Sequence, residues 1–156
     1  MSAEIIDKVM KAAESRGISK VVVASRGGKT ALKVFEALGK GVQVISISEF
    51  SYSDDTKKKM KKLKMIPVEE ANLVIQDSRD VKEILLNIGT GVKAAMEVAV
   101  IAKNRELVEG EFIAIAGGKS GLDTALMLDT NQLEFESMFE PVNQDVIKEF
   151  ITSALL

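Results

Sequence analysis

Apolar side chains recur along the chain in two patterns, one typical of helices and one typical of buried strands. A helical stripe runs through residues 4–16 and ends at Gly17. The run Val21-Val22-Val23-Ala24 that follows is apolar at every position, as in a strand covered on both faces. A second helix over residues 31–38 and a second strand over residues 42–47 come next. This succession predicts parallel strands joined by a right-handed crossover.

The middle of the chain is more polar, and its pattern is less regular. Asp54 and Asp55 open a lysine-rich helix over residues 56–63, with acids at the positive end of its dipole. A third strand is predicted over residues 65–68, and the proline within it places that strand at the edge of the sheet. Residues 69–77 fit no pattern.

The second half returns to long apolar periodic segments. Helical spacing appears over residues 81–88 and again over residues 92–100, so two helices are expected to meet at the Gly89-Thr90-Gly91 joint. A buried strand over residues 111–116 and an apolar run over residues 124–128 follow, separated by a glycine-rich turn.

The length of 156 residues is close to the commonest size of one domain, and no linker, repeat or low-complexity tract divides the chain. We therefore expect residues 1–156 to form a single α/β domain. Near the C-terminus, residues 147–152 suit either a helix or an edge strand.

The sequence contains no histidine and no cysteine, which restricts the chemistry available to it. Disulfides, thiolate nucleophiles and zinc fingers are excluded, and the commonest general base is missing. We expect no metal site. Any catalysis would have to use carboxylates, lysines, hydroxyls or a bound cofactor.

Charge and hydropathy argue against nucleic-acid and membrane partners. The formal net charge is −2, and the lysine run over residues 57–64 is read as a solvated helix face because no aromatic residues interleave it. No stretch approaches the roughly 18 apolar residues of a membrane helix. The N-terminus carries acids where a signal peptide needs bases, so a cytoplasmic protein is expected.

The strongest candidate site is the SRGGKT turn between the first strand and the second helix. Backbone N–H groups and the helix dipole converge at such a turn, which favours a phosphate or carboxylate. Glycines allow close approach, hydroxyls donate hydrogen bonds and the two basic side chains neutralise charge. The alternative is an ordinary turn in which Thr30 merely caps its helix. The candidate ligand-binding residues are Ser25, Arg26, Gly27, Gly28, Lys29 and Thr30.

The string Gly28-Lys29-Thr30 resembles the end of a Walker A loop, but the full pattern fails. A Walker A loop needs a glycine five positions before the second one, and Val23 occupies that position inside the strand. The turn is therefore too short to wrap a β-phosphate, and NTPase activity is not expected.

A second glycine-rich segment follows the strand over residues 111–116. In a doubly wound sheet it would lie beside the SRGGKT turn across the switch point, so two loops would close on one ligand. Asp123 would accept a hydrogen bond from a sugar, ribose or ribityl hydroxyl, or would hold its own loop together. The candidate ligand-binding residues here are Gly117, Gly118, Lys119, Gly121, Asp123 and Thr124.

Lys93 and Glu97 are four residues apart on the helix after the Gly89-Thr90-Gly91 joint. This is the spacing of a plain surface ion pair, which is the interpretation preferred for Lys93. Glu97 is surrounded by apolar residues, so it is expected to be partly buried, near the ligand or at an oligomer interface.

The A-S-R-G-G-K-T-A motif and the order of elements resemble the C-terminal α/β domain of pyruvate kinase, and more closely the stand-alone archaeal and bacterial proteins built from that domain. The likeness extends from about Arg16 to Leu128. It implies a three-layer α/β/α fold with a mixed five-stranded sheet of order 3-2-1-4-5, in which strand 5 is antiparallel. Its signature stretches are residues 21–33, Gly89 to Lys93 with Met96-Glu97, and Gly117-Gly118 with Gly121 to Ala125.

The resemblance also implies a ligand class. In pyruvate kinase, the segments matching residues 25–30 and 117–124 bind the phosphates of a sugar bisphosphate effector, and some stand-alone relatives are similar to binders of flavin mononucleotide (FMN). A sugar phosphate or FMN is therefore expected, with its phosphate on the SRGGKT turn. Residues 50–89 are shorter than in the longer relatives and lack their histidine, and that region would form one wall of a flavin pocket.

The barrel that carries the catalytic lysine and metal ligands of pyruvate kinase has no counterpart in this chain, so that activity is expected to be absent. The main hypothesis is a binding protein for a small phosphorylated ligand. The alternatives are a flavin-dependent enzyme and a regulatory or structural interaction module. Apolar faces on the helix after Gly91 also indicate self-association into a homo-oligomer.

Overall fold

The computed structural model describes residues 3–39, 41–72, 90–118, 121–131, 133 and 147–153. The helix expected over residues 81–88 lies outside this part of the chain, as does Lys119. The elements, in chain order, are α1 (Ala3–Arg16), β1 (Lys20–Ala24), α2 (Lys29–Leu38), β2 (Gln43–Ile47), α3 (Asp54–Lys62), β3 (Ile66–Val68), α5 (Thr90–Asn104), β4 (Glu111–Gly118), β5 (Gly121–Asp129) and β6 (Ile147–Ser153).

The strands of the described residues form one sheet of order β3-β2-β1-β4-β5-β6. The first four strands in that order are parallel, and β5 runs antiparallel to β4. The predicted order 3-2-1-4-5 with an antiparallel fifth strand is confirmed. Residues 147–153 add β6 antiparallel to β5, so this segment is a strand rather than a helix.

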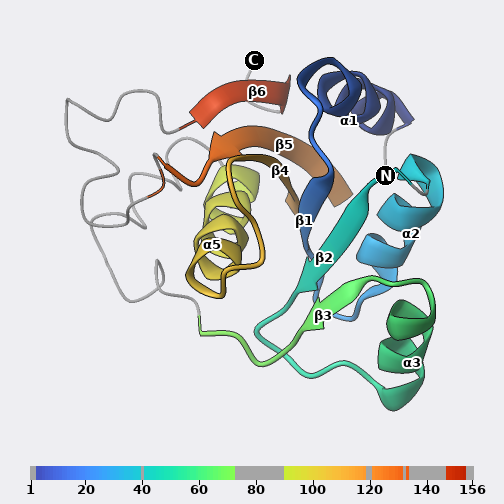
Figure 1. Cartoon of the computed structure of the whole chain (residues 1–156). Helices are drawn as coiled ribbons and strands as arrows, with labels where there is room; N and C mark the ends of the chain where they lie inside the picture. Colours follow the sequence, from blue (N-terminus) through green and yellow to red (C-terminus); the bar gives the residue numbers. More distant parts are fainter. Residues whose placement is uncertain are drawn as a thin grey trace.

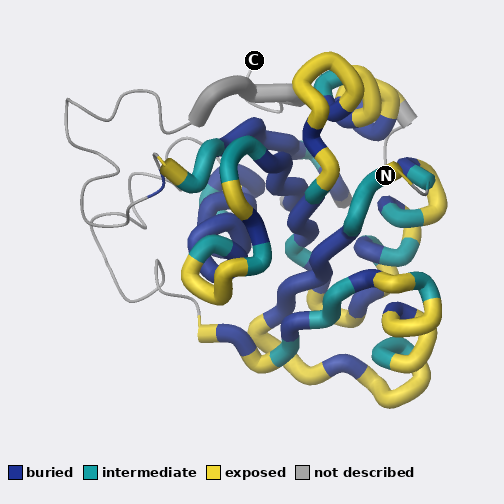
Figure 2. Tube along the Cα trace, viewed as in Figure 1, coloured by how far each residue is buried: buried dark blue, intermediate teal, exposed yellow. Residues whose placement is uncertain are grey.

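Helices cover both faces of the sheet, which confirms the three-layer α/β/α class. In Figure 1, α1, α2 and α3 lie on one side of the sheet and α5 lies on the other. Successive side chains of β1 point to opposite faces of the sheet, which fits this arrangement. Val22 faces the core that contains α5, whereas Val21 and Val23 face the core that contains α1 and α2. β1 is therefore buried on both faces, as its continuous apolar run predicts (Figure 2).

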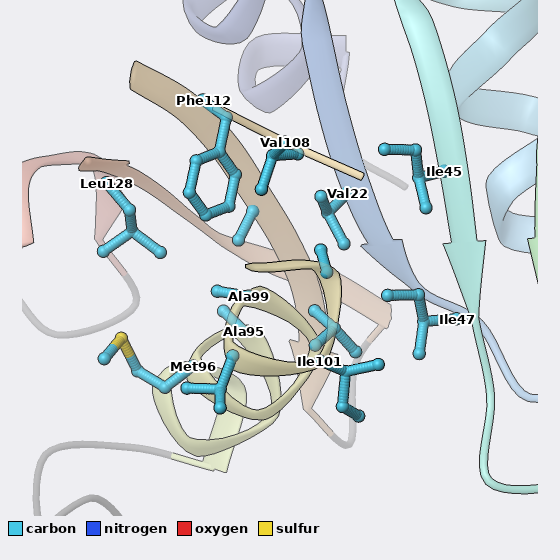
Figure 3. Packing of buried hydrophobic residues seen from close by; sticks show 14 of the residues in the cluster. Val22, Ile45, Ile47, Ala95, Met96, Ala99, Ile101, Val108, Phe112 and Leu128 are labelled. Carbon is cyan, nitrogen blue, oxygen red and sulfur yellow. The ribbon is translucent and has the colours of Figure 1, made fainter. Parts of the chain in front are cut away.

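The core on the α5 side is built from small and branched apolar residues. Figure 3 shows Ala95, Met96 and Ala99 of α5 beside the sheet residues Val22 and Phe112. Residues 95–102 are all buried within the single chain. The apolar faces that indicated self-association are thus already covered, and the homo-oligomer stays a prediction.

The lysine-rich helix α3 begins two residues before the expected position. Ser53 is its N-cap, and the side-chain oxygen of Ser53 accepts a hydrogen bond from the backbone N–H of Thr56. Asp54 and Asp55 therefore lie in the first turn, where they complement the helix dipole. No helix in the part of the chain that the structure describes is both long and apolar enough to cross a membrane.

Candidate functional site

Two adjoining hollows open at the carboxyl ends of β1 and β4. The chain leaves β1 through α2 on one face and enters β4 from α5 on the other, so this edge is the topological switch point of the sheet. We call the two hollows the α2 hollow, which has a volume of about 330 Å³, and the α5 hollow, which has a volume of about 280 Å³. They share Ala24, Ser25, Arg26 and Gly117 as lining residues.

The SRGGKT turn forms one wall of the α2 hollow, and Gly28 fixes its conformation. Gly28 has a φ of +89° and is the N-cap residue of α2. A Cβ at this position would lie 2.6 Å from Met60 Cε and 2.7 Å from Thr56 Cγ2, both on α3. Glycine is thus required by the backbone angle and by the contact with α3. The expectation that Thr30 caps α2, which is part of the ordinary-turn alternative, is wrong, because the cap is Gly28 and no side chain caps the helix there.

The first turn of α2 lies beside the α2 hollow, and two N–H groups of this turn already have acceptors within the chain. Ala31 N–H donates to Ser25 Oγ at 3.4 Å, and Leu32 N–H donates to the carbonyl of Gly28 at 3.0 Å. Lys29 and Thr30 occupy the first two helical positions, whose N–H groups have no acceptor within a helix. Both residues line the hollow, so the positive end of the α2 dipole lies beside it.

A buried hydroxyl pair supports the turn from below, and the sequence reasoning missed it. Tyr52 Oη donates to the carbonyl oxygen of Ser25 at 3.0 Å and lies 2.7 Å from Ser46 Oγ. Burial raises the pKa of the Tyr52 phenol to about 12; the hydrogen bond with Ser46 lowers it and the charge of Glu69 raises it further. The only available signal was a single tyrosine in a chain with few aromatic residues.

Arg26 is held at the mouth of both hollows by two contacts. Ser48 Oγ donates to the carbonyl oxygen of Arg26 at 3.0 Å, and the guanidinium lies 5.5 Å from the centroid of the Phe50 ring. This distance is within the range of a cation–π contact. Arg26 is itself exposed, so its side chain is accessible to solvent and to a ligand.

Lys93 and Glu97 form the predicted ion pair, but the pair is not on the surface. Lys93 Nζ donates to Glu97 Oε1, and the two side chains are only 14% and 3% exposed. Both line the α5 hollow, together with Ile47, Ser48, Ala94 and Val98. The preferred interpretation of Lys93 as part of a plain surface pair is therefore wrong. The expected burial of Glu97 is confirmed.

The second glycine-rich segment is a β-hairpin rather than an open loop. Gly117 and Gly118 belong to β4, and residues 121–124 belong to β5. Ala116 pairs with Thr124 and Gly117 with Leu122, so Asp123 is an extra residue in β5. Such a bulge turns neighbouring side chains towards the same face.

The bulge brings Asp123 and Thr124 against the start of α5. Thr124 Oγ1 donates to Asp123 Oδ1 at 2.9 Å, and a Cβ on Gly91 would lie 2.1 Å from Thr124 Oγ1. Neither Asp123 nor Thr124 lines the two hollows, whereas Gly117 lines both and Leu122 lines the α2 hollow. The structure therefore brings only part of this segment to the SRGGKT turn.

The two hollows differ in charge. The α2 hollow has Arg26 and Lys29 in its wall, and none of its described lining residues is acidic. In the α5 hollow, Arg26 and Lys93 are balanced by Glu49 and Glu97. Within the described residues, no group of three acidic side chains comes close enough together to hold a metal ion.

No protein-family model matches the chain, and no curated protein matches it. Among solved structures, the chain is similar to the pyruvate kinase of Cryptosporidium parvum in complex with ADP, with 15% identity and a TM-score of 0.44. The match covers 83% of this chain and 23% of that one, so the chain spans less than a quarter of the kinase. This distant match carries no argument about ligand or activity.

Proposed function

We propose that the protein binds a small phosphorylated metabolite, a sugar phosphate or FMN, with the phosphate in the α2 hollow. The observation that carries this proposal is the start of α2. Lys29 and Thr30 occupy its first two positions, where N–H groups have no acceptor within the helix, and both line a hollow whose described lining residues include two bases and no acid. A helix N-terminus with adjacent cations stabilises a phosphate by charge-assisted hydrogen bonds.

The rigidity of the turn supports the same proposal. Gly28 is packed against α3, and the carbonyls of Ser25 and Arg26 accept hydrogen bonds from Tyr52 and Ser48. A turn that is already ordered loses little conformational entropy when an anion binds to it. The supporting hydroxyls are directed at carbonyl oxygens, so they do not occupy the N–H groups of Lys29 and Thr30.

The size of the hollows favours the smaller member of the ligand class. Small-molecule sites usually enclose about 300–1,000 Å³, and each hollow lies near the lower limit. A sugar phosphate that passes beside Ser25 and Gly117, which line both hollows, would occupy the α2 hollow and the α5 hollow together. For FMN, the α5 hollow offers apolar walls at Ala24, Ile47, Ala94 and Val98, but its volume of about 280 Å³ is small for a three-ring system.

Calorimetric titration with glucose 6-phosphate, ribose 5-phosphate and FMN tests the proposal. Saturable binding of at least one of them, weakened by added salt, is the expected result because surface charges contribute to the attraction. Lys29→Gln should weaken binding about 10-fold, equivalent to about 1.4 kcal/mol. Thr30→Ala should weaken it by a smaller factor, since a neutral hydroxyl is lost.

Lys33→Gln is the matched control, because Lys33 is also an exposed lysine of α2 but lies one turn beyond the α2 hollow. It should leave the affinity within about twofold. The proposal is overturned if none of the three ligands saturates the protein. It is equally overturned if Lys29→Gln and Lys33→Gln have the same effect.

A further inference from the structure

The buried pair Lys93–Glu97 gives the α5 hollow a chemical character different from that of its neighbour. Its ammonium is a donor and its carboxylate is an acceptor, and both line the same hollow. The pair carries no net charge. A neutral hydroxyl can accept from the ammonium and donate to the carboxylate. An anion can accept from the ammonium but has no hydrogen to donate to the carboxylate.

We infer that the ligand is a phosphorylated polyol or sugar whose end opposite the phosphate is uncharged, and that Lys93 and Glu97 select for that neutral end. This inference rests on the proposed function, because it places the phosphate in the α2 hollow. It adds that the second end of the ligand lies in the α5 hollow, which shares Ala24, Ser25, Arg26 and Gly117 with the first.

Burial makes the selection strong. The carboxylate of Glu97 is 3% exposed, so a second anion in the hollow would meet a negative charge that water screens poorly. That anion would also compete with Glu97 for the ammonium of Lys93, and weakening a buried ion pair is costly. A ligand hydroxyl can accept from Lys93 and donate to Glu97 while the ion pair stays intact.

The rim of the α5 hollow supports the same selection. Glu49 is exposed and adds a further negative charge to the lining, beside the mouth where Arg26 is located. Among the described residues, Arg26 is the one cation that lines both hollows. The second end of a doubly anionic ligand would lie beside Glu49 and Glu97 as well as Arg26 and Lys93.

Two ligands that differ at one carbon test the inference. Glucitol 6-phosphate ends in a hydroxymethyl group, and 6-phosphogluconate ends in a carboxylate. The wild-type protein should bind glucitol 6-phosphate at least 10-fold more tightly in a calorimetric titration. Glu97→Gln should reduce this preference about 10-fold or reverse it, because Lys93 then faces the ligand without a carboxylate beside it.

Glu36→Gln is the control, since Glu36 is an exposed acid of α2 that lines neither hollow. It should leave the preference unchanged. If the wild-type protein binds 6-phosphogluconate as tightly as glucitol 6-phosphate, the inference is wrong, and this outcome requires no variant to fold. An unchanged preference in folded Glu97→Gln also overturns it.

The failure of this inference is distinguishable from the failure of the proposed function. If both ligands bind equally and Lys29→Gln weakens both, the phosphate subsite stands and only the neutral-end selection is lost. If neither of them binds but glucose 6-phosphate, ribose 5-phosphate or FMN does, the inference alone is wrong. If none of the five ligands binds, the phosphate subsite itself is wrong and the inference falls with it.

Discussion

Residues 25–30 and residues 117–124 are both rich in glycine and both lie at the carboxyl end of a buried strand, but they continue into different elements. The first segment leads into α2, whose opening N–H groups have no acceptor within the helix. The second leads into β5, and its backbone pairs in an antiparallel ladder with β4. A glycine-rich segment therefore exposes backbone donors to a ligand only when the element that follows leaves them without partners.

The two segments are also held in place differently. The SRGGKT turn is fixed by contacts with α3 and by hydroxyl groups beneath it, notably Tyr52. The hairpin is fixed by strand pairing and by the contact of Thr124 with Gly91. The first arrangement leaves the inner surface of the turn open to the α2 hollow, whereas the second turns Asp123 and Thr124 towards α5.

The largest expected effect is at the glycine that fixes the SRGGKT turn. Gly28→Ala should lower the free energy of unfolding by about 3 kcal/mol, because a left-handed backbone costs roughly 1–2 kcal/mol for alanine and overpacking adds about 1–3 kcal/mol. The new Cβ would meet Met60 Cε at 2.6 Å. Urea unfolding followed by circular dichroism measures the change.

Gly27→Ala is the matched control for that variant. A Cβ at Gly27 would have no atom within 4 Å, and its φ is not positive. The unfolding midpoint should therefore change little. Equal losses in the two variants would show that the contact of Gly28 with α3 does not fix the turn.

A smaller effect is expected where the hairpin meets α5. Gly91→Ala should lower the free energy of unfolding by about 2 kcal/mol, because its Cβ would lie 2.1 Å from Thr124 Oγ1. Thr124→Ala removes that oxygen, so the double variant should lose less than the sum of the two single variants. Additive losses in this double-mutant cycle would contradict the close packing of Gly91 on Thr124.

Much of the fold was predictable because its signals are local. The apolar run of β1, the helical stripe ending at Gly17 and the proline at the sheet edge each indicated the correct element. The sheet order came from the resemblance carried by the motifs. For β6, the sequence pattern fitted a helix and a strand equally, and the pairing with β5 decided between them.

The site was predictable only in part, because several of its features depend on contacts distant in sequence. Spacing alone placed Lys93 and Glu97 on one helix face but did not reveal that this face lines a hollow. Glycine content did not distinguish the hairpin at Gly117 from an open loop. The support that Tyr52 gives to Ser25 joins residues 27 positions apart, and no local pattern encodes it.

Removing the hydroxyl beneath the turn tests how much that support contributes. Tyr52→Phe should cost about 1.5 kcal/mol of unfolding free energy, because the Ser25 carbonyl and Ser46 Oγ lose a partner in a buried setting. Ser15→Ala, which removes an exposed hydroxyl bonded within α1, is the control and should have almost no effect. Equal stabilities of Tyr52→Phe and the wild type would contradict this role.

The stability difference between the wild type and Tyr52→Phe should depend on pH. The unfolded phenol ionises near its ordinary pKa of 10.0, whereas burial raises the folded pKa to about 12. The contribution of Tyr52 is therefore complete below pH 10 and is lost as pH rises towards 12, since the unfolded state releases its proton first. The stability difference between wild type and Tyr52→Phe should narrow over this interval.

The smallest expected effect is on the ligand affinity of a variant in the second glycine-rich segment, compared with a variant in the first. Asp123 accepts from Thr124 Oγ1 and lines neither hollow, so Asp123→Asn should change the affinity for glucose 6-phosphate less than about twofold. Lys29→Gln, in the SRGGKT turn, should weaken the same ligand about 10-fold. If Asp123→Asn weakened binding as much as Lys29→Gln while the protein stayed folded, the carboxylate would have to belong to the ligand site. The two segments would then act together, and the contrast between an open helix start and a closed hairpin would not explain where the ligand binds.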